Sequence, residues 1–479
     1  MTEGHVQPDI ESRLADSNEA LRPLCEKDQQ LPRVLGLVEA TAIVLGGIIG
    51  SGIFLAPAIV AREVGTPGLT LGVWVVCGLL TTCGALCYVE LSGAIPETGG
   101  TYAFLGRIYD SKLIAFLFGW TTFFAISAGT IAAGGTAFAS YSGYFLARYI
   151  PYSEWMIRCM AVLCILFLTS MNYMGARIGA SIQNVLTVIK VGSLVALILV
   201  CLVFGHSHRS QFQPLLPSGK SSPATILASF GTAMISVLFA YEGWTFSTHV
   251  AGEVKNPRRN IPLSIVLGMG VAFALYLAAN VAYIYVLPFE QLRQSTMVAT
   301  DALTSVVGGT GGTLIAIAVM ISTFGGANTL LLSFPRIQYA MSRDDLFFRW
   351  MGEAHPRFHG PSRAILTQGL LASAFALSGT YERILSYISF SQYLFLTLTV
   401  AGLIILRRKE PSLYRPHKVW GYPLTPLVFV LTCSWYLVNA LVYRFHETMV
   451  GVSIMLSGVP FYMYWSQKKK RQLRVDPRR

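Results

Sequence analysis

The chain has 479 residues, of which 53% are hydrophobic and only 13% are charged, and its mean hydropathy is +0.54. Soluble globular domains carry about 25% charged residues, so this composition excludes an ordinary soluble protein and indicates one embedded in a lipid bilayer. The net charge is +12, and basic clusters such as Lys468 to Arg471 are interpreted as membrane anchors that attract anionic lipid, not as nucleic-acid contacts.

The N-terminal segment, residues 1–33, is polar and mixed in charge, which predicts a flexible cytoplasmic tail and not a signal peptide. Beyond it, apolar runs alternate with polar loops. Each run is long enough for a transmembrane helix, which needs about 20 apolar residues, and none alternates like a barrel strand. Twelve spans are predicted, at residues 35–60, 69–95, 113–147, 155–174, 180–204, 226–250, 262–287, 311–342, 364–380, 383–406, 422–444 and 447–466.

The first span contains the sequence IVLGGIIGSGIF at residues 43–54. Its glycines 46, 47, 50 and 52 fall in mid-span, where each costs about 1 kcal/mol of helix stability relative to alanine. Such glycines either permit close helix packing or interrupt the helix, and lipid tolerates a break only where the freed backbone groups face protein or water. Four glycines and a serine within seven residues favour a break that binds an ion or a small polar solute.

A second interruption is predicted in span six, where Glu242 and Gly243 lie in mid-membrane within the sequence SVLFAYEGW. Buried acids are costly in a membrane and usually face a cavity or a partner. The two breaks match if spans 1–5 and 6–10 form two repeats, at about 34–206 and 226–406, followed by extra helices at about 422–466. Paired breaks point to a transporter site at the bilayer midplane. Half-helix N–H groups suit a carboxylate and half-helix carbonyls suit an ammonium, as in an α-amino acid.

Several motifs together resemble the amino acid–polyamine–organocation superfamily, and within it the L-type amino-acid transporters, the light chains of heteromeric transporters. The motifs are IIGSGIF at 48–54, YVEL at 88–91, PETGGTY at 96–102, FAYEGW at 239–244 and EVKNP through Pro262 at 253–262. The resemblance covers residues from about 33 to 466. It implies an all-α membrane protein with twelve transmembrane helices in a 5+5 inverted-repeat (LeuT-type) fold, in which helices 1 and 6 are broken, and secondary transport of amino acids by alternating access.

The resemblance further implies a substrate site made largely of backbone atoms at the two breaks. Its carboxylate-binding positions fall on Ile48, Ser51 and Gly52. Its amine-binding carbonyls fall on Phe239, Ala240 and Glu242, followed by Gly243. Phe239 also matches the aromatic residue that covers the substrate from outside.

Lys190 lies near the middle of span five, where a lysine costs about 2.5–3.5 kcal/mol on insertion scales. Both interfaces are about ten residues away, too far for its side chain to reach comfortably. The resemblance implies that Lys190, near Ser322, is an internal cation at the position that sodium occupies in sodium-coupled relatives. We therefore expect sodium-independent transport, with Lys190 bridging spans one, five and eight.

Two positions depart from the light-chain pattern. Light chains that bind a heavy chain through a disulfide carry a cysteine in the outer loop between spans three and four, and residues 148–154 contain none, so no disulfide-linked heavy chain is expected. Glu242 stands where several members for neutral substrates have a small residue. The acid would favour cationic amino acids if it faced the substrate, and neutral ones if it packed behind the site. The uncharged pocket residues expected from span ten, Phe390, Ser391 and Gln392, favour neutral amino acids.

The charge distribution predicts the orientation of the chain. With both termini inside, the cytoplasmic segments hold about 27 of the 36 Lys and Arg residues, the outer loops about 8, and Lys190 is in mid-membrane. This asymmetry predicts that both termini, including the basic tail at 467–479, lie in the cytoplasm. The expected location of this multi-pass protein is the plasma membrane.

The predicted function is sodium-independent transport of L-amino acids, with exchange and neutral substrates favoured. HExxH, GxSxG and P-loop motifs are absent from the sequence, and His206 and His208 have no neighbouring cysteine or acid, so no enzyme, cofactor or metal site is predicted. A cationic or proton-coupled amino-acid permease remains open, as does a receptor that binds an amino acid without moving it. The expected partners are amino acids and the lipid bilayer, without nucleic acid.

Overall fold

The computed structural model describes residues 31–205, 209–217, 222–378, 381–443 and 445–475, so the tail up to residue 30 and the last four residues lie outside it. The helices of the first half are α2 Leu37–Ile48, α3 Gly52–Val64, α4 Pro67–Ala94, α5 Thr101–Ile108, α6 Lys112–Thr121, α7 Ala128–Leu146, α8 Glu154–Tyr173, α9 Ala176–Phe204, α10 Pro223–Ala240 and α11 Phe246–His249. Those of the second half are α12 Pro257–Val286, α13 Phe289–Gln294, α14 Val298–Val307, α15 Gly309–Ser333, α16 Pro335–Arg343, α17 Ser362–Ser378, α18 Tyr381–Lys409, α19 Leu424–Tyr443 and α20 Phe445–Val475.

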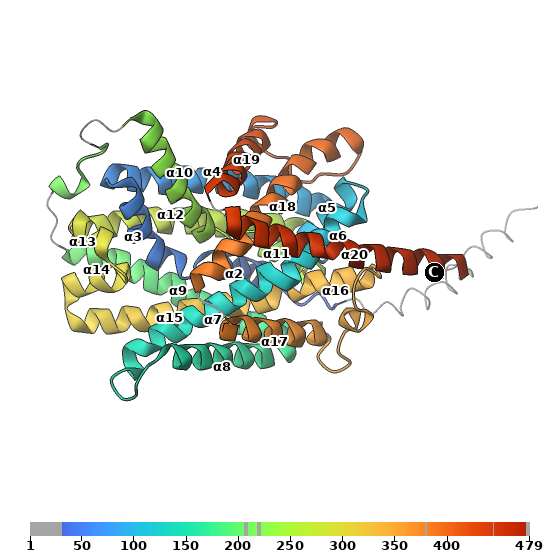
Figure 1. Cartoon of the computed structure of the whole chain (residues 1–479), viewed down its shortest axis with the longest axis horizontal. Helices are drawn as coiled ribbons and strands as arrows, with labels where there is room; N and C mark the ends of the chain where they lie inside the picture. Colours follow the sequence, from blue (N-terminus) through green and yellow to red (C-terminus); the bar gives the residue numbers. More distant parts are fainter. Residues whose placement is uncertain (1–30, 206–208, 218–221, 379–380, 444, 476–479) are drawn as a thin grey trace, which may run out of the picture.

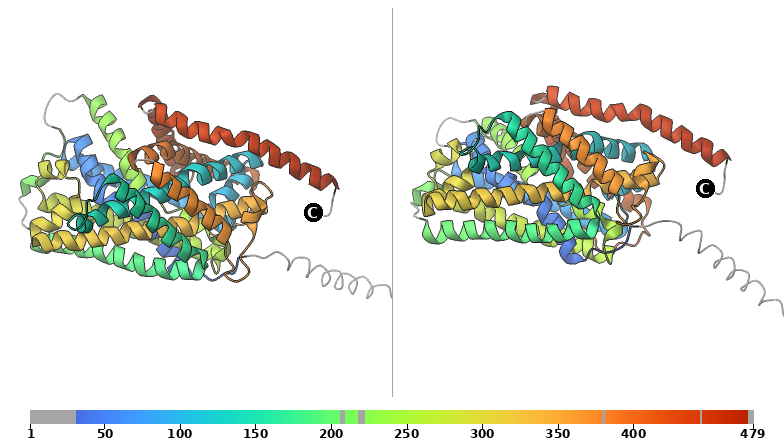
Figure 2. Two further views of the ribbon diagram at one scale, coloured as in Figure 1. Left: turned by 60° about the horizontal axis from the view of Figure 1, so that its bottom comes forward. Right: turned by 90° about the horizontal axis from the view of Figure 1, so that it is seen from below.

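Most of these helices run side by side along the long axis of the molecule, with α5 and α16 near one end and α13 and α14 at the other (Figure 1). Within the described residues, ten candidate spans are long and apolar enough to cross a membrane. They coincide with predicted spans one to eight, ten and eleven. The other two predicted spans correspond to α17 and to α20, which continues to Val475, beyond the predicted end at residue 466. The C-terminal part of α20 projects past the bundle (Figure 2).

The two longest predicted spans are not single regular helices. In span three, α6 and α7 are joined by a π-helical segment at Thr122–Ser127, and π-helical turns are frequent at functional sites. The side-chain amide of Gln368 donates to the carbonyl of Phe123 within this segment, at 3.4 Å. In span eight, α15 ends at Ser333 and α16 begins at Pro335, whose ring cannot extend the regular hydrogen-bond ladder.

The interrupted spans lie inside the helix bundle. The first span, α2 and α3, packs against α12, α9 and α10, while α15 packs against α7 and α9. Large aromatic side chains with almost no exposed surface, such as Trp74, Tyr241, Tyr276 and Tyr283, fill the space between these helices. The breaks are therefore surrounded by protein, which is the setting in which a membrane tolerates unwound backbone.

Two buried ion pairs join elements at the end of the molecule that carries α5 and α16. Arg336 and Glu253, almost completely buried, form a two-pronged pair with N–O distances of 2.8 and 3.2 Å. The carboxylate of Glu90 accepts hydrogen bonds from the guanidinium of Arg407, at 2.8 and 2.5 Å, and from the backbone N–H of Val419, at 2.7 Å. Because removal of one partner would leave a buried charge uncompensated, these pairs hold the end of α4 and α16 in fixed positions.

Candidate functional site

The first span is interrupted between Ile48, the last residue of α2, and Gly52, the first residue of α3. Ile49 and Gly50 donate backbone hydrogen bonds to the carbonyls of Leu45 and Ile48, which closes the end of α2. Of the expected carboxylate-binding positions, Ser51 is the N-cap residue of α3 and Gly52 is already its first helical residue. The first N–H groups of an α-helix lack a partner four residues earlier, so the N-terminus of α3 forms a positive helix end at the break; among them, the N–H of Phe54 donates to the carbonyl of Ser51 at 3.1 Å.

The sixth span is interrupted after Ala240, where α10 ends and the chain turns before α11 begins at Phe246. Gly243 adopts φ +123°, a conformation that side chains disfavour, so glycine suits this turn. The N–H of Glu242 donates to the carbonyl of Phe239 at 3.1 Å. The C-terminal end of α10 thus presents carbonyl oxygens toward the break.

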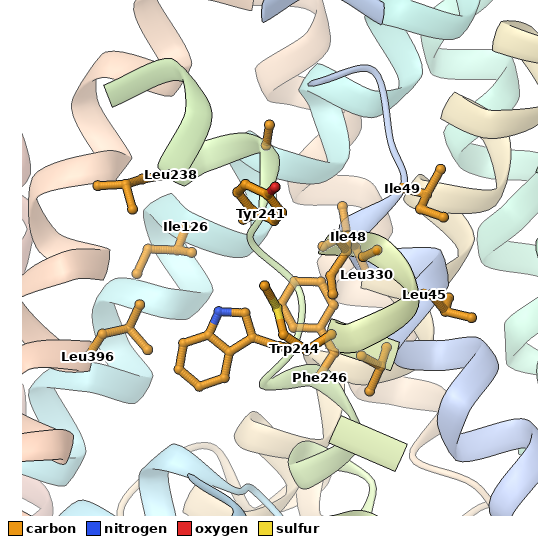
Figure 3. Packing of buried hydrophobic residues seen from close by; sticks show 14 of the residues in the cluster. Leu45, Ile48, Ile49, Ile126, Leu238, Tyr241, Trp244, Phe246, Leu330 and Leu396 are labelled. Carbon is orange, nitrogen blue, oxygen red and sulfur yellow. The ribbon is translucent and has the colours of Figure 1, made fainter. Parts of the chain in front are cut away.

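The two breaks touch each other through small residues. A Cβ atom placed on Gly52 would lie 2.7 Å from the Cβ and 2.9 Å from the Cα of Ala240, and a Cβ placed on Gly243 would enter the backbone of Gly47. Figure 3 shows the unwound stretch after α10 running beside the loop that joins α2 to α3, with Ile48 and Phe246 between them. The positive end of α3 and the carbonyl end of α10 therefore meet at one place.

A cavity lies at this junction. Six of the predicted substrate-site residues line it, namely Ile48, Ser51, Gly52, Phe239, Ala240 and Glu242. Gly243, Lys190 and Ser322 do not line it. Further walls come from α7, α15 and α18, and from two aromatic residues; the residues are Thr130, Ala133, Gly134, Thr323, Gly326, Ala327, Leu330, Gln392, Phe246 and Phe334. Sequence reasoning did not assign these wall residues of α7 and α15, although the small-residue runs AGTIAAGG and FGGAN in spans three and eight could have indicated them.

Glu242 and Gln392 lie together in the cavity wall. The side-chain amide of Gln392 donates a hydrogen bond to Oε1 of Glu242. Oε2 of Glu242 is buried and has no hydrogen-bond partner in the described structure. Of the three span-ten residues expected in the pocket, Gln392 lines it, whereas Phe390 and Ser391 are buried and are not among the lining residues, so the prediction for these two is wrong.

Lys190 lies directly behind the first break. Its ammonium donates to the carbonyls of Gly46 at 3.0 Å and Ile49 at 2.9 Å, and its side chain is almost completely buried. The hydroxyl of Ser322 reaches the carbonyl of the same Ile49 at 3.3 Å. Gly325 leaves room for the lysine, since a Cβ there would lie 2.7 Å from Lys190 Cε. Lys190 on α9 thus contacts α15 and the end of α2.

Comparisons with known proteins identify a family and several relatives of this chain. A family model described as amino acid permease matches residues 35–464. The mouse large neutral amino acids transporter small subunit 2 is 32% identical over 92% of this chain and 83% of its own length. The human cystine/glutamate transporter is 32% identical over 98% of this chain and 93% of its own length. The serine/threonine exchanger SteT of Bacillus subtilis is 29% identical over 93% of this chain and 99% of its own length.

Proposed function

The chain belongs to the amino acid permease family, and from this we propose that it is a sodium-independent secondary transporter of L-amino acids, working by exchange and preferring neutral substrates. We further propose that its ten candidate spans, with α17 and α20, form twelve transmembrane helices in a 5+5 inverted-repeat fold. Transport then follows from alternating access to the cavity between the two breaks.

The observation that carries this proposal is the meeting of two helix ends of opposite polarity in one cavity. The N-terminus of α3 offers N–H groups and a positive dipole end, which stabilise a carboxylate. The C-terminus of α10 offers carbonyl oxygens, which accept hydrogen bonds from an ammonium group. A ligand that satisfies both ends at once carries the two charges close together, as the backbone of an α-amino acid does.

Lys190 supports the sodium-independent part of the proposal. Its ammonium already donates to two carbonyls at the end of α2, and the hydroxyl of Ser322 shares one of them. A fixed positive charge at this place repels a second cation and satisfies the carbonyls that would otherwise bind it. The driving force would then come from another amino acid moving in the opposite direction, which is the basis for proposing exchange.

Glu242 separates the neutral and the cationic alternatives. Its Oε1 is engaged by Gln392, which supports a structural role and neutral substrates. Its Oε2 has no partner, which supports the alternative that it accepts a second ammonium or guanidinium group of a cationic substrate. We favour neutral substrates because Gln392 and the other wall residues of α7, α15 and α18 carry no charge.

The test is a competition panel in proteoliposomes. Leucine, alanine, serine and arginine compete against one labelled amino acid, with and without internal amino acid, and with sodium or choline outside. We expect the three neutral amino acids to compete better than arginine, uptake to require internal substrate, and sodium to make no difference. Stronger uptake in sodium contradicts sodium independence, and binding without flux contradicts transport in favour of a receptor.

The variant Glu242→Gln decides the role of the acid. We expect it to keep neutral uptake and the order of competitors, because the amide retains the size and the contact with Gln392. The same substitution at Glu97, which is exposed outside the cavity, is the matched control. A charge-assisted contact is worth about 1.5–3 kcal/mol, or ten- to a hundredfold in affinity. Cationic specificity would be established if arginine competes best in the native chain and if its affinity falls by about ten- to a hundredfold in Glu242→Gln but not in the Glu97 control.

We also propose that the protein works in the plasma membrane with both termini in the cytoplasm and without a disulfide-linked heavy chain. The loop between α7 and α8 contains no cysteine, and Cys159 lies within α8. Blue native electrophoresis of membranes, with and without reductant, tests the heavy-chain proposal. A larger complex that dissociates only on reduction would contradict it.

A further inference from the structure

The hydroxyl of Tyr276, on α12, lies between the two helix breaks. Its oxygen is 2.6 Å from the carbonyl oxygen of Ile48 at the first break and 3.2 Å from that of Ala240 at the second. Both carbonyls belong to the last residue of a helix, beyond the regular hydrogen-bond ladder, and the Ile48 carbonyl also accepts the N–H of Gly50 at 2.9 Å. One side chain on a third helix therefore contacts both of the interrupted helices.

The ring of Tyr276 has no room to move away from these carbonyls. The side chain has no exposed surface, and it meets Trp74 edge-on with 5.5 Å between ring centroids. On another side the ring of Tyr241 lies 5.0 Å away. Aromatic rings packed in this way are held by many contacts at interior density, so the position of the hydroxyl is fixed by the helix packing.

The hydroxyl has a single hydrogen for two acceptors. The 2.6 Å distance to Ile48 is within the normal range for an O–H···O bond, and the 3.2 Å distance to Ala240 is slightly beyond it. A carbonyl oxygen has two lone pairs, so the Ala240 carbonyl can still accept a hydrogen bond from a ligand. Tyr276 thus fixes the distance between the breaks without using up the acceptor that the substrate needs.

We propose that Tyr276 is a positioning residue that makes the site specific for α-amino acids, because it sets the spacing between the N–H groups of α3 and the carbonyls of α10. This inference rests on the proposed function. In an α-amino acid one carbon joins the ammonium and carboxylate groups, whereas in a β-amino acid two carbons separate them. A site whose two halves are held at one spacing accepts the first and rejects the second, whatever the substrate side chain.

The experiment measures competition by alanine and β-alanine, and by leucine and β-leucine, against labelled leucine in proteoliposomes. Tyr276→Phe removes the hydroxyl and keeps the ring. We expect it to lower the apparent affinities for alanine and leucine by the same factor, about tenfold, as for loss of a buried hydrogen bond. The apparent affinities for the two β-amino acids should fall less. The preference for α- over β-amino acids should therefore fall while the leucine-to-alanine ratio stays constant.

Tyr241→Phe is the matched control. It removes one hydroxyl from the same aromatic cluster, but that hydroxyl faces the carbonyl of Trp74 at 3.5 Å and contacts neither break carbonyl. We expect it to retain the native preference. A general loosening of the core would instead lower the preference in both variants, and that result would overturn the positioning role.

Two further variants keep the test independent of folding defects. 4-Fluorophenylalanine at position 276 fills the space of the hydroxyl but has no hydrogen-bond donor, so this variant should lose the preference for α- over β-amino acids. Incorporation of 4-aminophenylalanine restores an N–H donor and should recover it. Native preference in the fluorinated or the phenylalanine variant overturns the inference while leaving the proposed function intact. Failure of the native chain to bind any amino acid overturns the proposed function itself.

Discussion

Gly52 is the residue at which an added side chain tests the substrate site most directly. In Gly52→Val, the new Cβ would lie within 3 Å of the backbone of Ala240, so the two breaks must separate. We expect transport to be abolished while the protein still reaches the membrane. The control is Gly270→Val on α12, where an added Cβ meets no atom within 4 Å. Substrate affinity at the native level in Gly52→Val would show that the close approach of the breaks is unimportant for binding.

At the residue scale, the sequence located the breaks but not their contacts. Glycines that destabilise a helix and an acid in mid-membrane are visible in the chain, so Ser51, Gly52 and Glu242 could be predicted near a cavity. The contacts of Tyr276 with Ile48 and of Gln392 with Glu242 join residues more than 100 positions apart. Apolar patterning predicts which face of a helix is buried but not which residue it meets, so these contacts required the structure.

At the scale of elements, Lys190 connects α9 to the end of α2. We expect Lys190→Ala to slow transport more than it weakens binding. Without the ammonium, the carbonyls of Gly46 and Ile49 lose their hydrogen-bond donor, and the end of α2 is no longer connected to α9 during the transport cycle. A hydrogen bond from a charged group contributes about 1.5–3 kcal/mol, so the turnover rate should fall at least tenfold. The control is Ser193→Ala, one turn further along α9, where the hydroxyl donates only within its own helix in the described contacts. Equal losses in binding and in rate would contradict this role.

The structure of the individual spans was predictable only in part. The twelve apolar runs predicted helices, and each run contains helix in the described residues, interrupted by the breaks in spans one and six. The π-helical segment at Thr122–Ser127 has no sequence signal, because TFFAIS contains ordinary helix residues and its irregular hydrogen bonds depend on the surrounding packing. The short helices α5, α13 and α14 were missed because they are too short to produce an apolar run of membrane length.

At the scale of the whole molecule, the proposed orientation predicts which loops are accessible from outside the cell. Tyr149, between α7 and α8, and Trp420, between α18 and α19, are 80% and 84% exposed. We expect a membrane-impermeant maleimide to label Tyr149→Cys in intact cells and Trp420→Cys only after permeabilisation. The described native cysteines are all in helices and at least half-buried, and Cys25→Ser removes the remaining one. The reverse pattern of labelling would place the termini outside.

The contacts of Gly52 with Ala240 and of Gly243 with Gly47 also bear on how the substrate preference of such a permease can change during evolution. In the proposed function, backbone atoms recognise the part that all amino acids share, and a point mutation cannot replace a backbone N–H or C=O with a different group. The opposite walls, with Thr130, Thr323 and Gln392, are made of side chains that single mutations can exchange. Under the proposed function, substrate preference can therefore change at these walls while the backbone contacts to the common part stay the same.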